Sequence, residues 1–510
     1  MACGAVAAGH EQTAAAARWV LRQGGNAFDA VIAAHFAACV AEPVLSSLGG
    51  GGFLCARQAG MLPRIYDFFS HTPHSKKSGD AIEFIPVEVD FGTAQQVFHI
   101  GMGATAIPGT VAGLWSVHRE LATLPLSMLV QPAQDLARNG VVINDFQAYI
   151  FRILAPILSF NKASQSLFTD AHGGILQAGM TFRNPDFADT LDYLVTEGSR
   201  GFYQGDLASL ISQLSTRHGG HIQMEDLEQY RTLTRNPLTV NYQNHQIYLN
   251  PPPSSGGVLI ACALHLLQHA GIGTTEFGSL THLRRLTEIM ALTQRIRNDF
   301  LHAEHALENL LSPELLQAYR RILDSGLSMT RGTTHISVVD NAGNSASLTT
   351  SNGEGNGYII PGTGILLNNM LGEEDLNPLG FHRWREDTRL TSMMCPSLIT
   401  GSNGTEFVIG SGGSNRIRSA ILQVISGLLD FQFPLPKAVA NPRIHFENGT
   451  LHLETGFNDV VKKTLQHHYH VNSWPELNLY FGGAHCVGLK QQQMTAVGDI
   501  RRGGVGYVVP

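Results

Sequence analysis

The sequence has few charged residues and no cluster of positive charge. Charged residues make up 15% of the 510 positions, and the formal net charge is −7. Binding to nucleic acid requires a basic face that meets the phosphates, but the closest arrangements here are two pairs, Lys76-Lys77 and Arg501-Arg502. We interpret both pairs as solvated charge and expect no nucleic-acid partner.

Cysteine is scarce and scattered. The six cysteines have no CxxC spacing, and four of them stand in apolar stretches; they are Cys3, Cys39, Cys55, Cys262, Cys395 and Cys486. A free thiol in such a stretch packs as a small hydrophobic group. The cysteine pattern therefore argues against a disulfide framework.

Long apolar runs are absent as well. The run at 30–41 contains His35 and is too short to cross a bilayer. The first residues, MACGAVAAGHEQ, lack the basic start and continuous apolar stretch of a secretion signal. We expect a cytoplasmic protein without a membrane partner, or a periplasmic or secreted one if a leader has been removed.

Several familiar catalytic and cofactor motifs are missing. There is no GxSxG or HExxH motif, and the four glycines at 49–52 lack the Lys-Ser/Thr of a phosphate loop, so we expect them to pack against a strand. The histidines at 467, 468 and 470 have no acidic or cysteine partner at ligand spacing. We expect neither a cofactor nor a metal.

The remaining pattern is that of a globular α+β protein. Hydrophobic residues make up 43% of the chain, and segments 11–23 and 27–40 read as Ala-rich helices, the second capped by Asn26. Helical spacing is expected at 110–139 and 276–319, and the proline-rich segment 250–257 is expected to form an extended loop. After Thr333 the pattern changes to a β-hairpin that reaches Ser351. No linker or composition break appears, so we expect one shared core.

Two short motifs could carry chemistry. If the peptide bond before Thr333 is cut, the α-amino group of that residue, with a pKa near 8, becomes a general base beside its own hydroxyl. Gly412 and Gly413 stand before an expected helix, where a Gly-Gly turn can direct backbone N–H groups at an oxyanion. Taken alone, both motifs also have an ordinary explanation, because Thr-Thr opens many hairpins and Gly-Gly forms many turns.

With these residues identified, the chain resembles the γ-glutamyltransferase (γ-glutamyltranspeptidase) family of the N-terminal-nucleophile hydrolase superfamily, as a divergent member. The matching segments occur in family order and span essentially the whole chain. They are 24–30 (GGNAFDA), 48–53 (LGGGGF), 108–109 (PG), 132–133 (PA), 202–205 (FYQG), 226–227 (DL), 252–257 (PPSSGG), 333–340 (TTHISVVD), 364–369 (GILLNN), 410–414 (GSGGS), 441–443 (NPR) and 499–504 (DIRRGG).

The resemblance implies a fold, a processing step and a reaction. The implied fold is a four-layer αββα sandwich, and the implied cleavage falls between Gly332 and Thr333, leaving a large fragment (1–332) and a small fragment (333–510) as one interwoven unit. Thr333 would attack a γ-glutamyl amide such as that of glutathione, and water or an amine would release the acyl group. Gly412 and Gly413 would form the oxyanion hole, with Ser351 supporting the nucleophile.

The departures from the family pattern concern the substrate. The family binds the glutamate carboxylate with an arginine after Asp-Phe, where this chain has Phe69. One of two carboxylate-binding serines remains as Ser392, and Met393 follows it. Met370 replaces a glutamine, Glu373 stands for the acidic partner of the substrate amine, and Asn352 lies one position from the expected asparagine. An aromatic ring cannot make the bidentate contact of a guanidinium. Arg383, Arg385 or Arg389 could supply the missing charge, although surface placement fits them equally well.

Three hypotheses follow, in this order. The first is a γ-glutamyl hydrolase or transferase. The second is an acylase for a less polar acyl group, with the same nucleophile. The third is an unprocessed binding or structural protein, in which Thr333 has no catalytic role.

Overall fold

Two antiparallel sheets stack face to face at the centre of the molecule. The computed structural model describes residues 2–90, 95–302, 333–377 and 379–510. One sheet has the strand order β20 (Val505–Val509), β1 (Gly4–Ala8), β11 (Thr334–Asp340), β12 (Ser345–Ser351), β2 (Gly51–Arg57), β3 (Arg64–Phe68) and β8 (Leu233–Arg235). The other has the order β19 (Gln493–Val497), β18 (Gly483–Lys490), β14 (Glu406–Gly412), β13 (Ser397–Gly401), β10 (His245–Leu249) and β9 (Leu238–Tyr242).

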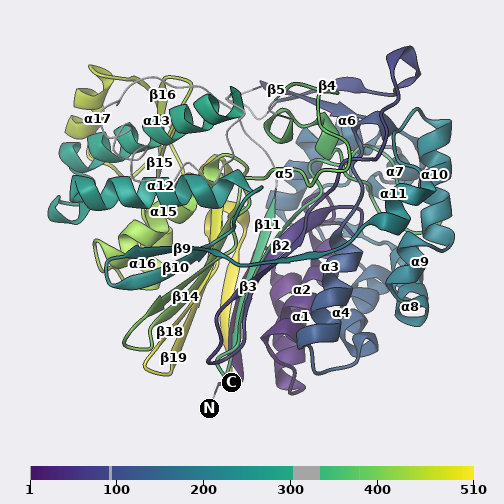
Figure 1. Ribbon diagram of the computed structural model, residues 1–510, viewed down its shortest axis with the longest axis horizontal. Helices are drawn as coiled ribbons and strands as arrows, with labels where there is room; N and C mark the ends of the chain where they lie inside the picture. Colours follow the sequence, from purple (N-terminus) through teal and green to yellow (C-terminus); the bar gives the residue numbers. More distant parts are fainter. Residues whose placement is uncertain (1, 91–94, 303–332, 378) are drawn as a thin grey trace.

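Helices cover the outer face of each sheet (Figure 1). On the first sheet lie α1 (Glu11–Arg22) and α2 (Ala27–Ala41), and on the second lie α12 (Ser255–Ala270) and α15 (Arg416–Leu429), with α13 (Leu280–His302) packed against α12. The result is a helix, sheet, sheet, helix sandwich. The expected four-layer αββα fold is confirmed.

The other elements surround this sandwich. In the described parts of the chain, the remaining helices of four or more residues are α3 (Thr110–Leu121), α4 (Leu126–Asn139), α5 (Asp145–Ile153), α6 (Ala155–Leu158), α7 (Lys162–Phe168), α8 (Pro185–Glu197), α9 (Ser199–Tyr203), α10 (Asp206–Arg217), α11 (Met224–Gln229), α16 (Leu435–Ala440) and α17 (Asp459–Gln466). The small sheets comprise β4 (Ile85–Asp90) with β5 (Gln95–Ile100), β6 (Val141–Val142) with β7 (Thr181–Phe182), and β15 (Ile444–Glu447), β16 (Thr450–Leu453) and β17 (His470–Ser473).

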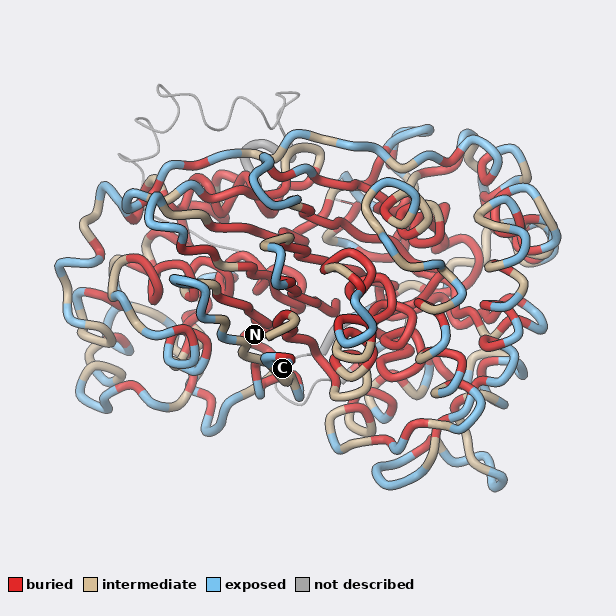
Figure 2. The backbone as a smooth tube through the Cα atoms, turned by 90° about the horizontal axis from the view of Figure 1, so that it is seen from below, coloured by how far each residue is buried: buried red, intermediate tan, exposed pale blue. Residues whose placement is uncertain are grey.

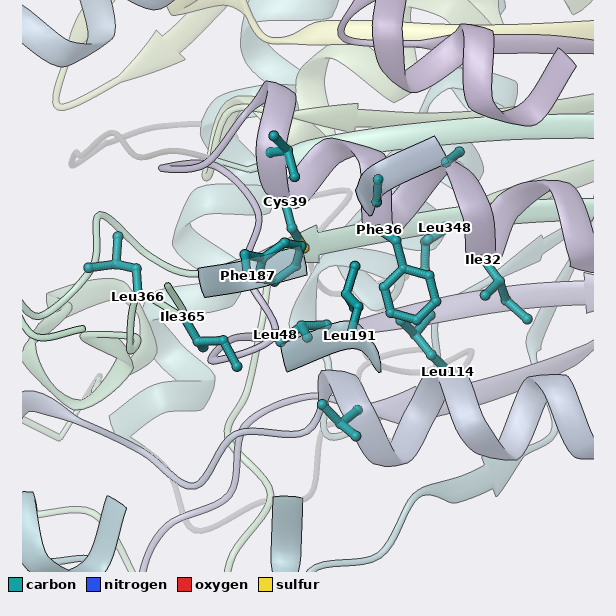
Figure 3. Close-up of a cluster of buried hydrophobic side chains, with 14 of the residues drawn as sticks. Ile32, Phe36, Cys39, Leu48, Leu114, Phe187, Leu191, Leu348, Ile365 and Leu366 are labelled. Carbon is teal, nitrogen blue, oxygen red and sulfur yellow. The ribbon is translucent and has the colours of Figure 1, made fainter. Parts of the chain in front are cut away.

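Strand alternation divides the apolar residues between two cores. In β1, Val6 and Ala8 pack in the core under α1 and α2, whereas Ala5 and Ala7 pack between the two sheets. Successive strand residues point to opposite faces, so a sheet buried on both faces needs an apolar residue at nearly every position. Figure 3 shows part of the first core, where Phe36 of α2 and Leu348 of β12 come together.

The predicted N-terminal helices are confirmed, and side-chain caps explain where they begin. The imidazole of His10 accepts the N–H of Gln12 at the start of α1. Asn26 and Asp29 form a reciprocal capping box at the start of α2, which satisfies N–H groups that the helix itself leaves unpaired. All fifteen residues of α2 are buried, because the helix lies between the first sheet and other helices.

The proline-rich segment differs in part from the prediction. Its last three residues, Ser255 to Gly257, form the first turn of α12 rather than an extended loop. The carbonyl of Ser392 accepts the N–H groups of Ser255 and Gly256, which anchors this helix start. A Cβ on Gly257 would lie 2.0 Å from the carbonyl oxygen of Asn250, so the turn requires glycine there. The helical pattern expected at 276–319 is described as α13, and its later part lies outside the described residues.

The parts of the chain before and after position 333 are interwoven. Strand β1 lies between β11 and β20, and β12 lies between β11 and β2. The pairing of Gly4 with Val509 also brings the two ends of the chain side by side (Figure 2). Neither part therefore completes the first sheet without the other.

Buried histidines make the fold sensitive to acid. Burial lowers the pKa of His35 to about 3 and that of His485 to about 4. Below pH 6.5 these histidines bind protons in the unfolded chain but stay neutral in the folded chain. The free energy of unfolding therefore has its full value above pH 6.5 and falls as the pH drops toward 4. We expect a loss of about 1.4 kcal/mol per pH unit for each histidine. Unfolding at pH 6.5 and pH 5 measures this slope.

Two matched variants test whether His35 contributes to this slope of the unfolding free energy against pH. His35→Gln should flatten it, whereas His74→Gln should not, because His74 is exposed and Asp387 raises its pKa. An unchanged slope in His35→Gln would contradict the assignment.

Candidate active site

Thr333 lies at the entrance to the first sheet. It directly precedes β11 and is 4% exposed. Thr334 pairs with Thr350 across β11 and β12, so the same register carries Thr333 to the level of Ser351. The structure thus brings the expected nucleophile and its expected supporting hydroxyl to the same end of two neighbouring strands.

The predicted Gly-Gly turn packs against Thr333. Gly412 ends β14, Gly413 has φ 121°, and α15 begins at Arg416, so the predicted strand-to-helix turn is present. A Cβ on Gly412 would lie 2.0 Å from the carbonyl oxygen of Thr333, and one on Gly413 would lie 2.9 Å from the Cα of Gly482. Only glycine allows so close an approach of backbone to backbone. We call residues 412–414 the glycine turn.

Arg502 joins the glycine turn to Thr333, and our interpretation of Arg501-Arg502 as solvated charge was wrong. Both residues are 5% exposed. The Nη1 of Arg502 donates to the Thr333 carbonyl at 3.2 Å and lies against Gly412. Burial, with repulsion from Arg416, lowers the pKa of Arg502 to about 10. The guanidinium therefore holds the main chain beside the hydroxyl expected to react.

Arg501 is also buried, and carboxylates pair with its guanidinium. It binds Glu454 at 2.5 Å and Asp499 at 3.1 Å. Side chains this long are rarely buried unless charges of opposite sign meet them. Asp499 stands two positions before Arg501 in the sequence, whereas Glu454 comes next to it only in the folded chain, so the dipeptide alone does not predict its burial.

A buried carboxylate lies behind the expected nucleophile and was not predicted from the sequence. Glu42 accepts the hydroxyls of Thr13 and Thr334, each at 2.8 Å. Burial raises the pKa of this carboxyl, while the two hydroxyl contacts oppose the rise. Glu42 thus ties the residue after Thr333 to α1.

Ser351 and the expected amine-binding residues lie on one loop region. The Oγ of Ser351 accepts the N–H of Gly353 at 3.0 Å. A Cβ on Gly353 would meet the Oε1 of Glu373 at 2.4 Å, so this carboxylate lies directly on the loop after Ser351. Asn352 and Glu373 are both buried, and the Nδ2 of Asn352 donates to the carbonyl of Leu367 at 3.4 Å. These three predicted site residues are brought together.

The four glycines at 49–52 confirm the expected strand packing. A Cβ on Gly50 would lie 2.3 Å from the carbonyl oxygen of Ser351, and one on Gly52 would lie 2.5 Å from that of Thr349. Glycine therefore allows this segment to press against β12, which carries Ser351.

Phe69 and the two methionines that replace polar residues of the family lie in apolar surroundings. The ring of Phe69 stacks on Phe53 with centroids 5.4 Å apart and is 1% exposed. Met370 and Met393 belong to the same buried hydrophobic cluster. The hydroxyl of Ser392 accepts the N–H of Met394 at 3.0 Å. The residues expected at the acyl-binding side are therefore mostly apolar in this chain.

Arg389 does not stand in for the missing arginine. Its guanidinium pairs with Asp67 at 3.4 Å and donates to the Tyr230 hydroxyl, to the carbonyl of Arg231 and to that of Phe69. It is 7% exposed. These contacts hold the main chain on both sides of Phe69 in place. Arg383 and Arg385 are exposed, as surface placement predicts.

The described residues contain neither a metal-binding group of side chains nor a membrane-spanning helix. Across residues 2–90, 95–302, 333–377 and 379–510, no three His, Cys, Asp or Glu side chains form a group suited to a metal ion. His467, His468 and His470 flank the end of α17 and are not buried. No described helix is long and apolar enough to span a bilayer.

Known proteins match this chain over most of its length. The family profile described as Gamma-glutamyltranspeptidase matches residues 13–509. A glutathione hydrolase proenzyme of Pseudomonas aeruginosa is 31% identical over 87% of this chain and 83% of its own. The Acylase ACY 1 proenzyme of Pseudomonas sp. (strain V22) is 30% identical over 91% of this chain and 86% of its own.

A solved structure supports the fold. The cephalosporin acylase of Bacillus halodurans superposes with a TM-score of 0.84 over 99% of this chain and 96% of its own, at 22% identity. At this identity the likeness speaks for the fold alone. Together with the profile match and the two relatives, it leads to one assignment: this chain is an enzyme of the gamma-glutamyltranspeptidase family.

Proposed function

We propose that the chain cuts itself before Thr333 and then cleaves γ-glutamyl amides through an acyl-enzyme on that residue. The observation that supports this proposal most is the close approach of Gly412 to the Thr333 carbonyl, because backbone without a side chain lies against the main chain of the proposed nucleophile. Glutathione hydrolase proenzymes among the relatives support the donor class and the processing step. Gly332, on the other side of the proposed cut, lies outside the described residues.

The proposed reaction uses one residue as both nucleophile and base. The free α-amino group of Thr333, with a pKa near 8, accepts the hydroxyl proton while the oxygen attacks the amide carbon. The oxyanion of the tetrahedral intermediate is stabilised by backbone N–H groups of Gly412 and Gly413. The amine leaves with the proton, and water or a second amine then attacks the ester. Ser351 supports the nucleophile, and Asn352, Glu373 and Ser392 bind the donor.

A second function is favoured by one specific observation. Phe69, Met370 and Met393 share an apolar cluster where the family places polar substrate-binding groups. An acyl group without the glutamate α-carboxylate and amine suits these apolar residues better, because burying a charge without a partner is costly. The acylase proenzyme among the relatives supports this alternative.

Intact mass and a donor panel test the proposal. Incubated protein should give two fragments, 1–332 and 333–510, and should hydrolyse a γ-glutamyl anilide. Hydrolysis of only alkanoyl anilides would favour the acylase function. A protein that stays uncut and turns over neither donor would leave the unprocessed binding protein as the remaining hypothesis.

Phe69→Arg should shift the preference toward γ-glutamyl donors. A guanidinium at this position can pair with the donor carboxylate, and such a charge-assisted pair changes specificity by about a hundredfold. We expect the ratio of kcat/KM for γ-glutamyl anilide over hexanoyl anilide to rise by roughly that factor.

The matched control for this change is Phe69→Leu. It removes the stacking on Phe53 without adding charge, so its ratio should stay near the wild-type value. A ratio that does not change in Phe69→Arg, in folded and processed protein, would contradict the role of residue 69 in donor selection.

A further inference from the structure

Asp375 joins two parts of the candidate site that are far apart in sequence. It lies in the short segment Glu374–Leu376, two positions after Glu373. Its Oδ2 accepts the Ser414 hydroxyl at 2.8 Å, and its Oδ1 accepts the Nδ2 of Asn415 at 3.4 Å. One carboxylate thus binds the glycine turn and the residue after it.

The glycine turn needs such an anchor, because Ser414 has a strained backbone. Its φ is 50°, in the left-handed region that residues with a Cβ seldom adopt. Strain of this kind, of order 1–3 kcal/mol, persists only where surrounding contacts hold it. Ser414 is 8% exposed, and its hydroxyl is held by Asp375. Ser414 directly follows Gly413, so its conformation fixes the path of the chain out of the turn.

Helix α13 supports the same contact from the part of the chain before the proposed cut. The guanidinium of Arg297 lies 3.6 Å from the Asp375 carboxylate and donates to the Oδ1 of Asn415 at 3.2 Å. Both members of the ion pair are nearly buried, with 8% and 9% of their side chains exposed. A second acid, Glu447, accepts the amide of Asn415 at 2.9 Å. Asn415 therefore has partners on two sides.

We propose that Asp375 is a positioning residue that holds the glycine turn in the geometry needed to stabilise the oxyanion. It touches none of the reacting atoms and acts through Ser414. The inference rests on the proposed function, and it adds a coupling between the turn and the segment that carries Glu373. Asp375 thereby connects the segment that carries Glu373, where the donor amine would bind, to the turn whose backbone N–H groups would stabilise the oxyanion.

A positioning role of this kind acts on the transition state more than on substrate binding. Removing one oxyanion donor costs about a hundredfold to a thousandfold in kcat, so a donor that is only displaced should cost less. Losing the Asp375–Ser414 contact is expected to lower kcat about tenfold to a hundredfold, with KM within about threefold of wild type.

The test compares Ser414→Ala, Asp375→Asn, the double variant and Glu374→Gln. Glu374 is the exposed neighbour of Asp375 and serves as the matched control. Intact mass gives the processed fraction, and kcat is expressed per processed chain with γ-glutamyl and hexanoyl anilides. Because the two residues act as one unit, the kcat of the double variant should lie within about twofold of the kcat of the less active single variant. Glu374→Gln should match wild type.

Three results would overturn the positioning role: wild-type kcat in Ser414→Ala, losses that multiply in the double variant, or a change confined to KM. Ser414→Ala leaves every charge in place, so it keeps the test decisive if Asp375→Asn does not fold. A wild-type protein that is neither cut nor active would refute the proposed function itself, and the positioning role with it. An active wild type with an unaffected Ser414→Ala refutes the positioning role alone.

Discussion

Thr333→Ala protein should remain one uncut chain and lose amide turnover by about ten-thousandfold or more. The change removes the only group proposed to attack the amide, and nucleophile deletions in enzymes that form acyl intermediates have effects of this order. Without cleavage the α-amino group of residue 333 also stays in a peptide bond, so the proposed base is missing too. Intact mass and initial rates with anilide donors measure both effects.

Thr333→Ser is the matched control for that variant. Serine keeps a hydroxyl and, after cleavage, an α-amino group, so this protein should still be cut and should keep measurable turnover. The proposed mechanism would be contradicted by a Thr333→Ala protein that appears as two fragments, or that turns over anilides at the wild-type rate.

Gly412→Ala should produce the next largest effect. The new Cβ would lie 2.0 Å from the carbonyl oxygen of Thr333 and 3.2 Å from the Nη1 of Arg502. The closer neighbour is main chain and cannot rotate away, so Thr333 and the turn must separate. A displacement of about 1 Å at reacting groups costs about a hundredfold in rate. We expect kcat to fall by that factor or more, together with slower appearance of the two fragments.

Gly174→Ala serves as the control for adding a methyl group at a glycine. Its Cβ would have an ordinary contact, 3.4 Å from the Asp170 carboxylate, at a backbone conformation open to alanine. Thermal unfolding should separate a local effect of Gly412→Ala from loss of the fold. If Gly412→Ala keeps the wild-type kcat, the proposed place of the glycine turn in catalysis is wrong.

At the expected acyl-binding side, the sequence and the structure each explain a different part of the change at residue 69. The replacement of the family arginine by Phe69 is visible in the sequence, and it predicts a changed donor preference. The structure adds that the ring is stacked on Phe53 and that Arg389 is held by Asp67 and Tyr230. From the sequence alone, an arginine elsewhere in the chain could replace the missing one. Its guanidinium is instead used to hold the backbone of Phe69.

Much of the fold follows from local sequence patterns. The alternation of apolar residues after Thr333 predicted the hairpin of β11 and β12, and Asn26 marked the start of α2. These features involve residues a few positions apart, where periodicity and capping act directly. The proline-rich segment was misjudged at its end, because the start of α12 depends on the carbonyl of Ser392, far along the chain.

The sequence by itself determined the layered fold class, the family, and the residue types able to form a nucleophile and an oxyanion turn. Only the tertiary structure decided which charged residues are buried beside them: Arg502 on the Thr333 carbonyl, Glu42 on Thr334, and Asp375 on Ser414. The physical reason is that a buried charge is stable only where opposite charges and hydrogen-bond donors meet it. Those partners come from distant parts of the chain, and they become neighbours only when both sheets are in place.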